Sequence, residues 1–476
     1  NPASMPHGIL RLSETRRDAD DDIIVTFLVA SFQWASRQAG DDVTNPRPSF
    51  APQEGAVFGR PINNISFYRN RFVALTDENV VCSVAGDFFN FWAKTAQAIT
   101  PSDPIDLQVS NNYPAVLYGA QPTTAGLIVF SENAQFMLGT ENDVLEPRTA
   151  RTTLLSSYNF NKDSNPVNLG TTVGFVSGIG RYTRFYEMAN VSRDQEPEVV
   201  EQSKVVERLM PGDYQQVGIS KDNQIVAFGK REYDTVWIFR YFNTGEKRVL
   251  SSWFRWTMLG NIVHHAIIKD SYYVALHKGS SVYLVRSDLR PQRNTTTVTE
   301  EDFRVHFDYY GSVEDSNLTY DANTNATTFT LPIPYFSGEE LKAFSLGTEA
   351  GRIGDITVSG TTGSLIGDWT DTDIALGYTF NMQVNFPIIY PTSKSGLSGT
   401  IQADTRGSLI VSRIKLSLGD TGFYQATLKS LGRDDRVITF ESATLGTYLA
   451  DSVAINAGTI RTIPVYDRNT NVRLEL

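Results

Sequence analysis

Clustered carboxylates and histidines are the first residues in this sequence whose types and spacing could do chemistry, because both can hold a metal ion. The runs Asp18–Asp22 (DADDD) and Asp368–Asp373 (DWTDTD) could supply oxygen ligands to a hard cation such as calcium. Both lack the glycine and terminal glutamate that organise a known calcium loop, so solvated turns are the favoured interpretation. His264 and His265 are adjacent in a strand-like run, where neighbouring side chains point to opposite faces and cannot easily share one metal. We predict no metal site.

Nucleophilic and hydrolytic chemistry finds little support in the motifs. Cys82 is the single cysteine, and its place within an apolar strand predicts a buried, inert thiol. The sequence has no Gly-x-Ser-x-Gly elbow, no His-Glu-x-x-His, no phosphate-binding Gly-Lys-Ser/Thr loop and no Cys/His ligand cluster. The two carboxylates of a glycan hydrolase need no fixed spacing, and among 53 acidic residues some pair could always be nominated. We therefore predict no catalytic residues, no cofactor and no enzyme.

A repeated β-hairpin is the strongest structural pattern. Residues 72–75 and 80–84 are apolar runs rich in β-branched residues, and a polar turn lies between them. The turn centres of successive copies are roughly 50 residues apart, the blade length of kelch-like propellers. An ordinary large β-sandwich is the alternative, but its strands would recur faster, at about 8–12 residues. The further copies are 127–130 with 135–138, 173–176 with 185–186, 225–228 with 235–239, and 272–276 with 281–285.

The rest of the chain is also predicted to be β-structure. Residues 327–331, 409–416 and 422–428 read as half-buried strands of a sandwich, after a polar connection that begins near residue 290. The best helical candidate, residues 197–210, is short and charged and is interpreted as a solvated surface helix. The predicted fold class is all-β: an irregular β-propeller of kelch-length blades plus a β-sandwich-like assembly domain. The expected boundaries are a linking segment at 1–60, the propeller at 61–290 and the assembly domain at 291–476.

The formal charge of −11 argues against a protein that grips nucleic acid, because such proteins neutralise phosphates with clustered lysine and arginine. The basic residues occur as scattered pairs, such as Lys230-Arg231 and Lys247-Arg248, which are interpreted as solvated loop charges. An acidic balance does suit a conduit, because a negative wall repels phosphate and lets DNA slide. The most apolar run, Ile23–Ala30, has the length of a strand and is too short for a membrane span.

Residues 65–92 carry a resemblance to a known family. Phe67-Tyr-Arg-Asn-Arg-Phe72, the turn at Glu78-Asn79 and the run Ala85–Trp92 (AGDFFNFW) resemble the signature of the tail tubular B, or tail nozzle, proteins of short-tailed bacteriophages. Five shorter landmarks occur in the same order: Met5–Arg11, Asn45–Phe50, Asp103–Asp106, Glu132–Phe136 and Ser251–Trp256. The signature positions, for which a structural role is expected, are Arg69, Asn70, Arg71, Glu78, Asn79, Asp87, Phe88, Phe89, Phe91 and Trp92.

The resemblance implies a structural virion protein of the phage tail, assembled in the host cytoplasm. It implies a ring of copies, a hexamer, beneath the adaptor ring under the portal, with tail fibres attached and the host cell envelope as the target. Genomic DNA would pass through the lumen without specific binding. In this family a long N-terminal region precedes the Met-Pro-His landmark, so the chain is expected to be part of a longer polypeptide.

Two other classes stay open. A receptor-binding or glycan-degrading tail component would show a concave site with stacked aromatics and paired carboxylates. A generic cellular propeller that serves as an interaction scaffold is the third reading, and the landmarks at Arg69-Asn70-Arg71 and Asp87-Phe88-Phe89 argue against it.

Overall fold

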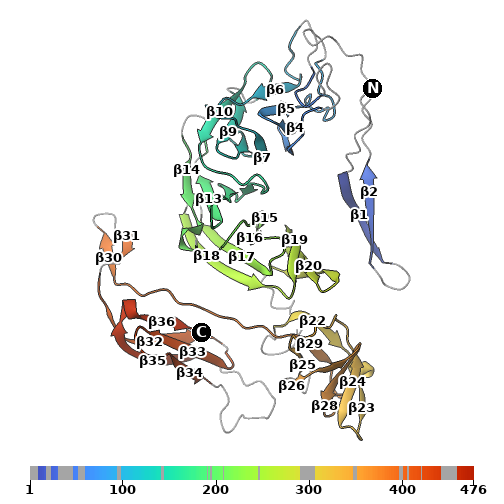
Figure 1. Cartoon of the computed structure of the whole chain (residues 1–476), viewed down its shortest axis with the longest axis vertical. Coiled ribbons are helices and arrows are strands. Elements are labelled where there is room, and N and C mark those ends of the chain that lie inside the picture. Colours follow the sequence, from blue (N-terminus) through green and yellow to red (C-terminus); the bar gives the residue numbers. More distant parts are fainter. Residues whose placement is uncertain are drawn as a thin grey trace. The chain divides into compact units, whose positions relative to one another are not determined.

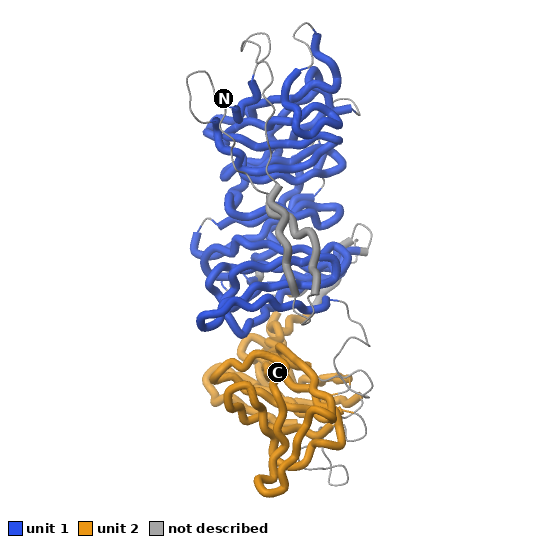
Figure 2. Tube along the Cα trace, turned by 90° about the vertical axis from the view of Figure 1, so that its right-hand side faces the viewer, with its two compact units in different colours: residues 1–290 blue, residues 291–476 orange. Residues whose placement is uncertain are grey.

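In a computed structural model of the protein, the regular structure of the described residues consists of β-strands and short 3-10 turns. The structure describes residues 9–17, 23–30, 47–51, 59–93, 98–140, 144–178, 180–189, 191–192, 196–206, 208, 210–244, 247–289, 306–346, 351–395, 400–404, 407–419, 421–440 and 458–476. The chain divides into two compact units, residues 1–290 and 291–476 (Figure 2). Within the described residues, no helix is long and apolar enough to cross a membrane.

Among its described residues, unit 1 contains five antiparallel sheets of three or four strands, each built from strands that are consecutive in the sequence (Figure 1). A separate hairpin precedes them, formed by β1 (Ile9–Arg17) and β2 (Ile23–Ala30). Sheet 1 comprises β3 (Asn64–Tyr68), β4 (Arg71–Thr76), β5 (Asn79–Cys82) and β6 (Ile105–Gln108); sheet 2 comprises β7 (Leu117–Pro122), β8 (Leu127–Ser131), β9 (Gln135–Thr140) and β10 (Ala150–Ser156). Sheet 3 comprises β11 (Val167–Asn168), β12 (Val173–Ser177), β13 (Arg184–Ala189) and β14 (Glu198–Glu201); sheet 4 comprises β15 (Gln216–Ser220), β16 (Ile225–Gly229), β17 (Thr235–Thr244) and β18 (Lys247–Thr257). Sheet 5 comprises β19 (Asn261–Ile268), β20 (Ser271–Lys278) and β21 (Ser281–Asp288).

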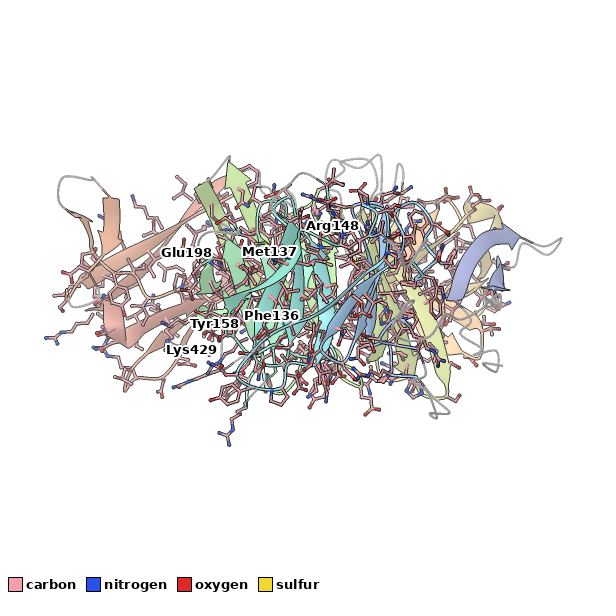
Figure 3. All side chains as sticks on the ribbon, turned by 90° about the horizontal axis from the view of Figure 1, so that it is seen from above. Phe136, Met137, Arg148, Tyr158, Glu198 and Lys429 are labelled. Carbon is pink, nitrogen blue, oxygen red and sulfur yellow. The ribbon has the colours of Figure 1, made fainter. Side chains whose placement is uncertain are left out.

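All five predicted hairpins are present, as β4–β5, β8–β9, β12–β13, β16–β17 and β20–β21. Each sheet packs on the next one along the chain. Phe136 of β9 lies in the apolar core between sheets 1 and 2, and the adjacent Met137 lies in the core between sheets 2 and 3. Both residues are labelled in Figure 3. A third core joins sheets 3 and 4 around Phe185 and Phe228, and β15 packs against β19 of sheet 5.

This serial packing explains why the central strands are apolar on both faces. The five residues of β8, β12 and β16 are all buried, because each of these strands has a sheet above it and a sheet below it. Burying one large apolar side chain contributes about 1.5–3 kcal/mol, so each junction between sheets is held by several such contributions. The prediction of an all-β chain with propeller-like repetition is confirmed.

Unit 2 contains two smaller β-structures. In the first, the sheet β22-β29-β25-β26 lies next to the sheet β23-β24-β28-β27; the bounds are β22 (Asp308–Val313), β23 (Thr319–Asp321), β24 (Ala326–Thr330), β25 (Leu341–Ser345), β26 (Ile353–Asp355), β27 (Thr357–Ser359), β28 (Thr362–Ile366) and β29 (Ile374–Tyr378). In the second, β32 (Ile410–Leu418) pairs with β35 (Thr459–Arg468), and β33 (Tyr424–Ser430) lies between β34 (Arg436–Phe440) and β36 (Val472–Glu475). One apolar core joins these five strands, as expected for a sandwich. The hairpin β30 (Thr392–Ser395) with β31 (Thr400–Ala403) lies between the two structures in sequence.

The surface helix expected over residues 197–210 is wrong. Residues Glu198–Glu201 form β14, the outer strand of sheet 3, and a 3-10 turn follows at Ser203–Val205. Two neighbouring β-branched valines favour the strand, and the backbone N–H of Gln202 continues the pairing by donating to the carbonyl of Phe185. Of the charged residues that suggested a solvated helix, Glu198 and Glu201 lie on this edge strand and Lys204 lies in the 3-10 turn.

Candidate functional site

The family signature begins at the tight turn between β3 and β4. Tyr68 pairs with Arg71, so Arg69 and Asn70 alone make the turn, and both have positive φ, 44° and 60°. Positive φ at both central residues defines the type I′ turn, whose twist matches that of the flanking strands. Asparagine adopts this conformation more readily than most residues, which gives a physical reason for Asn70 at the second position.

Arg71 is the most deeply buried charged residue of the signature, with 1% of its surface exposed. Its guanidinium donates to five backbone carbonyls: those of Ser83 (2.7 Å), Pro101 (2.7 Å), Ser102 (3.3 Å), Asp103 (2.7 Å) and Leu145 (3.2 Å). Burial lowers the pKa of Arg71 from its ordinary value, because the charged form is partly desolvated. The side chain thereby ties the end of β5, the loop before β6 and the β9–β10 connection of sheet 2 to one point.

Asn79 lies where three of the sequence landmarks meet. Its side-chain amide donates to the Ser49 hydroxyl (3.1 Å) and to the Asp106 carboxylate (2.9 Å). The backbone N–H and the hydroxyl of Ser49 also donate to that carboxylate, at 2.7 and 2.9 Å. Landmarks at residues 45–50, 78–79 and 103–106 are therefore parts of one hydrogen-bonded cluster, although up to 57 residues separate them in sequence.

Glu78 anchors the connection between sheets 1 and 2. Its carboxylate accepts from the backbone N–H of Ala115 (3.0 Å) and from the side-chain amide of Gln108 (2.8 Å). These two hydrogen bonds hold the pKa of Glu78 below its ordinary value, and the bond from Ala115 contributes more than the bond from Gln108. The carboxylate thus stays ionised and fixes the chain between β6 and β7.

An aromatic cluster lies beside the β3–β4 turn. The ring of Phe67 makes edge contacts with Phe72 and Phe88, both at 5.3 Å between centroids, and Phe91 packs at 5.0 Å on Phe50 of another landmark. Phe91 is buried and Trp92 is half-buried, whereas Phe89 is 60% exposed. Asp87 is exposed; its backbone forms an isolated β-bridge with Val84, and its carbonyl accepts from the backbone N–H of Asn90. The signature therefore has a buried framework and a partly exposed aromatic rim.

The remaining candidates have structural contacts. Cys82 is buried, as predicted, and burial raises the pKa of its thiol to about 12, so the thiol stays protonated near neutral pH. His265 is buried between sheets 4 and 5, whereas its neighbour His264 is exposed, so the two do face opposite ways. Asp368 accepts hydrogen bonds from the backbone N–H and hydroxyl of Thr370, as a turn-forming aspartate does. The run at residues 18–22 lies outside the described residues.

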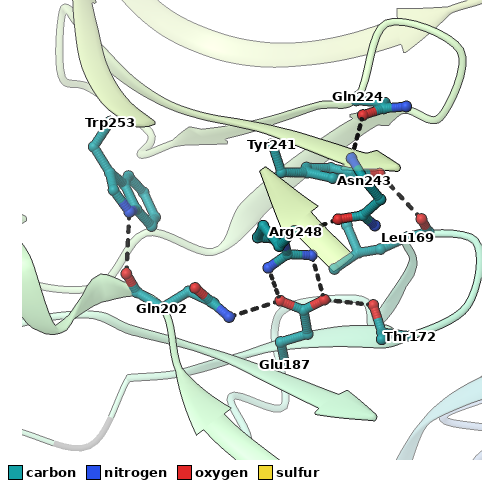
Figure 4. A network of polar contacts seen from close by, with 9 residues as sticks. All are labelled: Leu169, Thr172, Glu187, Gln202, Gln224, Tyr241, Asn243, Arg248 and Trp253. Atoms are coloured by element: carbon teal, nitrogen blue, oxygen red, sulfur yellow. Dashed lines mark hydrogen bonds and ion pairs between the residues drawn. The ribbon is translucent and has the colours of Figure 1, made fainter. Parts of the chain in front are cut away.

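One buried ionic network was missed by the sequence reasoning. Arg248 is not a loop charge: it belongs to β18, and its guanidinium binds both carboxylate oxygens of Glu187 on β13, one of them at 2.7 Å (Figure 4). Thr172 (2.5 Å) and Gln202 (2.8 Å) donate to the same carboxylate. Asn243 orients the arginine by accepting from its Nε at 3.1 Å. Glu187 is buried, so this network is a specific link between sheets 3 and 4.

A shallow hollow of about 290 Å³ lies beside the signature. Its lining includes one carboxylate, Glu78, and one aromatic ring, Tyr113, together with five further residues: Gln108, Val109, Ser110, Asn111 and Ala115. A glycosidase needs a pair of carboxyl groups, one of them with a raised pKa so that it can act as an acid. Glu78 has a lowered pKa and two committed hydrogen bonds, so this hollow is not built for that chemistry.

The stacked sheets and the signature cluster define a structural all-β protein whose named residues position backbone segments. Comparison with known proteins identifies the family. The bacteriophage nozzle protein family matches over residues 1–476, and the chain belongs to that family. It is a structural component of the phage tail, and the resemblance predicted from the signature is confirmed.

The tail tubular protein gp12 of Escherichia phage T7 is 26% identical over 337 residues, which cover 70% of this chain and 40% of the phage T7 protein. The chain thus spans less than half the length of that relative. Among solved structures, Hsv2 of Kluyvelomyces marxianus aligns with 10% identity and a TM-score of 0.30, covering 68% of this chain and 93% of that protein. The N-terminal domain of Nup159 aligns with 12% identity and a TM-score of 0.28, covering 71% and 95%. At such low scores neither likeness carries an argument.

Proposed function

We propose that the chain forms the distal tube of a short phage tail and that the genome passes through this tube during ejection. The match of the nozzle family to residues 1–476 is the observation that carries the proposal. Copies of the chain form a ring, a hexamer, that docks on the adaptor ring below the portal and helps to seat the tail fibres. The open end of the tube then faces the host cell envelope, and no step in this role requires catalysis.

A closed ring needs a head-to-tail interface, in which two different surfaces of one subunit are complementary and the rotation between neighbours closes on itself. We assign the sheet stack at residues 61–290 and the β-rich part at residues 291–476 to separate roles, the second being assembly of the platform and nozzle. The division of the chain into compact units at residues 290 and 291 supports this assignment.

Passage of DNA without specific binding is supported by charge. The formal charge is −11, so the protein as a whole repels phosphate. The pairs Lys230-Arg231 and Lys247-Arg248 each have a member engaged within the protein. Arg248 binds Glu187, and the Lys230 ammonium lies 3.9 Å from the centre of the Tyr233 ring. Strong DNA binding depends on free cations that release counterions from phosphate.

The experiment is negative-stain imaging with light-scattering mass determination on the purified protein, alone and mixed with its adaptor ring. In the presence of the adaptor we expect rings or tube ends with a central hole, whose mass exceeds that of the adaptor ring by six subunit masses. A stable monomer that ignores the adaptor and binds or degrades host polysaccharide would overturn the proposal. That outcome would favour the receptor-binding or glycan-degrading alternative, which the lining of the hollow beside Glu78 does not support.

A further inference from the structure

The two β-structures of unit 2 carry charges of opposite sign. The first, over residues 306–346 and 351–378, has ten acidic and two basic residues. The second, over residues 407–419, 421–440 and 458–476, has eight basic and four acidic residues. Because the whole chain has a formal charge of −11, the second structure differs in sign from the protein that carries it. Charges segregated in this way indicate complementary surfaces.

The outward side of the β32–β35 pair forms a basic face. Arg413 and Lys415 lie across from residues that flank the fully buried Ile463, so both point away from the core. Arg436 reaches the same side by donating to the carbonyl of Pro464, the partner of Arg413. The basic face comprises four exposed cations: Arg413, Lys415, Arg436 and Arg468.

Three acidic residues lie near these cations in sequence, and none forms an ion pair with them. Asp467 pairs with the buried Val411, and its carboxylate accepts from the side-chain amide of Asn471 at 3.3 Å. Asp434 and Asp435 belong to the turn between β33 and β34, in the other layer of the sandwich. Among the described residues, no ion pair joins a carboxylate to any cation of the basic face.

The first β-structure has an acidic end, where three connections between strands meet. The backbone N–H of Asp315 donates to the carboxylate of Asp373 at 2.8 Å, which joins the β22–β23 and β28–β29 connections. Gly367 donates to the carbonyl of Asn325 at 2.8 Å and brings in the β23–β24 turn. The acidic end comprises six exposed carboxylates: Glu314, Asp315, Asp321, Asp368, Asp371 and Asp373.

Arg352 is a cation beside this acidic end, but its guanidinium has other partners. It donates to the backbone carbonyl of Asp368 at 2.5 Å and lies 4.0 Å from the centre of the Trp369 ring. Six carboxylates near one guanidinium leave the end strongly negative.

Both surfaces also carry exposed apolar side chains. Ile460 and Tyr466 of β35 are 70% and 74% exposed, and Ile366, next to the acidic end, is 82% exposed. Interfaces between proteins combine apolar and aromatic contacts with a polar rim. This composition favours a protein partner for the basic face over a polyanion.

We propose that the basic face of one copy docks on the acidic end of the next copy in the ring. The inference rests on the proposed function, because a closed ring needs two different, complementary surfaces on each subunit. It also explains how passing DNA avoids the basic face. Free cations bind phosphate strongly, whereas cations covered by carboxylates do not.

Single charge reversals test this in the assembly assay on the adaptor ring. Lys415→Glu alters the basic face, and Asp371→Lys alters the acidic end. Arg473→Glu, exposed on the opposite layer of the same sandwich, is the matched control. We expect the first two variants to need about tenfold more protein, or more, for half-maximal assembly, because like charges then meet at the interface. The control should assemble like the wild type, and circular dichroism confirms that all three variants are folded.

An equimolar mixture of Lys415→Glu and Asp371→Lys shows whether the two surfaces meet between copies. Each altered surface then finds its complement on the other variant, so we expect assembly to recover. Recovery in a chain that carries both substitutions, but not in the mixture, would show that the surfaces meet within one molecule. Recovery in neither, with binding of an anionic polymer lost in Lys415→Glu, would assign the basic face to a polyanion. Either result overturns the proposal.

Salt dependence separates this inference from the proposed function. Wild-type assembly should weaken between about 0.1 M and about 1 M salt, because the screening length falls from about 10 Å to about 3 Å. Rings that form equally in both salts and in both variants overturn the inference and leave the proposed function standing. A wild type that forms no ring at either salt concentration overturns both.

Discussion

Acid should weaken the junction between sheets 4 and 5 through a single side chain, His265. Its Nε2 lies 3.0 Å from the carbonyl oxygen of Gln216, and because a carbonyl only accepts, Nε2 carries the proton. Its Nδ1 is buried and has no partner among the described residues. A second proton on Nδ1 would therefore be desolvated and unpaired, and burial lowers the pKa of His265 to about 4.

The sign and size of this effect of pH on stability follow from the linkage between proton binding and folding. In the unfolded chain the pKa of a histidine is about 6.5, so between about pH 6.5 and about pH 4 the unfolded state binds a proton that the folded state does not. The contribution of His265 to stability is therefore complete above about pH 6.5 and declines as the pH falls to about 4. At about 1.4 kcal/mol for each pH unit, the total loss is on the order of 3 kcal/mol.

The assay is urea unfolding followed by tryptophan fluorescence at about pH 7 and about pH 4.5, where most of this loss has occurred. His265→Gln keeps a donor for the Gln216 carbonyl and cannot be protonated, so the difference between the two pH values should shrink by about 2–3 kcal/mol. His264→Gln, at the exposed neighbouring position, should behave like the wild type. Equal pH dependence in His265→Gln and the wild type would refute the reasoning, as would a histidine NMR signal of residue 265 that titrates near its ordinary value.

Three further substitutions test other contacts by the same unfolding measurement. Arg71→Met should lower the free energy of unfolding by about 3 kcal/mol or more, because several buried carbonyls lose their donor. Arg69→Met, in the adjacent turn, is the control and should cost less than about 1 kcal/mol. Equal losses in the two variants would contradict the role of the buried guanidinium. Glu187→Gln should lower the free energy of unfolding by about 2–4 kcal/mol, because it leaves Arg248 without its anion. The double variant with Arg248→Met should recover part of that loss. Strictly additive losses in this double-mutant cycle would show that the two residues are not coupled. Gly229→Ala should lower the free energy of unfolding by about 1–3 kcal/mol, because a Cβ there would lie 2.4 Å from the His265 ring. Gly419→Ala is the neutral control, because a Cβ there would have nothing within 4 Å. No loss at either position would show that the His265 ring can move aside.

The hairpins were predictable because their signal is local. Apolar runs of four or five residues around a polar turn fix each strand and its partner, and the recurrence at roughly 50 residues indicated serial blades. The prediction of a helix over residues 197–210 failed because the charged residues were interpreted as the solvated face of a helix. The neighbouring valines of β14 favour an edge strand. Propensity is a weak prior when a neighbouring strand offers pairing.

The polar framework could not be predicted, because it joins residues far apart in sequence. Nothing near Arg248 in the sequence points to Glu187, 61 residues earlier, and a Lys-Arg pair beside a polar turn normally lies in solvent. The signature positions could be named from the resemblance, but the convergence of Ser49 and Asn79 on the carboxylate of Asp106 required coordinates. A buried charge in an apolar strand, such as Glu187, is the one local signal that a partner must exist.

Directional polar contacts accompany the apolar core at each step of the stack, and this combination bears on the proposed role. Arg71 ties sheet 1 to sheet 2, and buried Gln135 of sheet 2 donates to the carbonyl of Tyr158 in the chain that leads to sheet 3. Glu187 links sheet 3 to sheet 4, and His265 links sheet 5 back to sheet 4. Apolar contact alone is non-directional and would let one sheet slide on the next, whereas a buried hydrogen bond that is broken by sliding costs about 1–3 kcal/mol. Sheets held in fixed register make a stiff subunit, which is what a tube wall needs if its bore is to keep its shape while DNA passes.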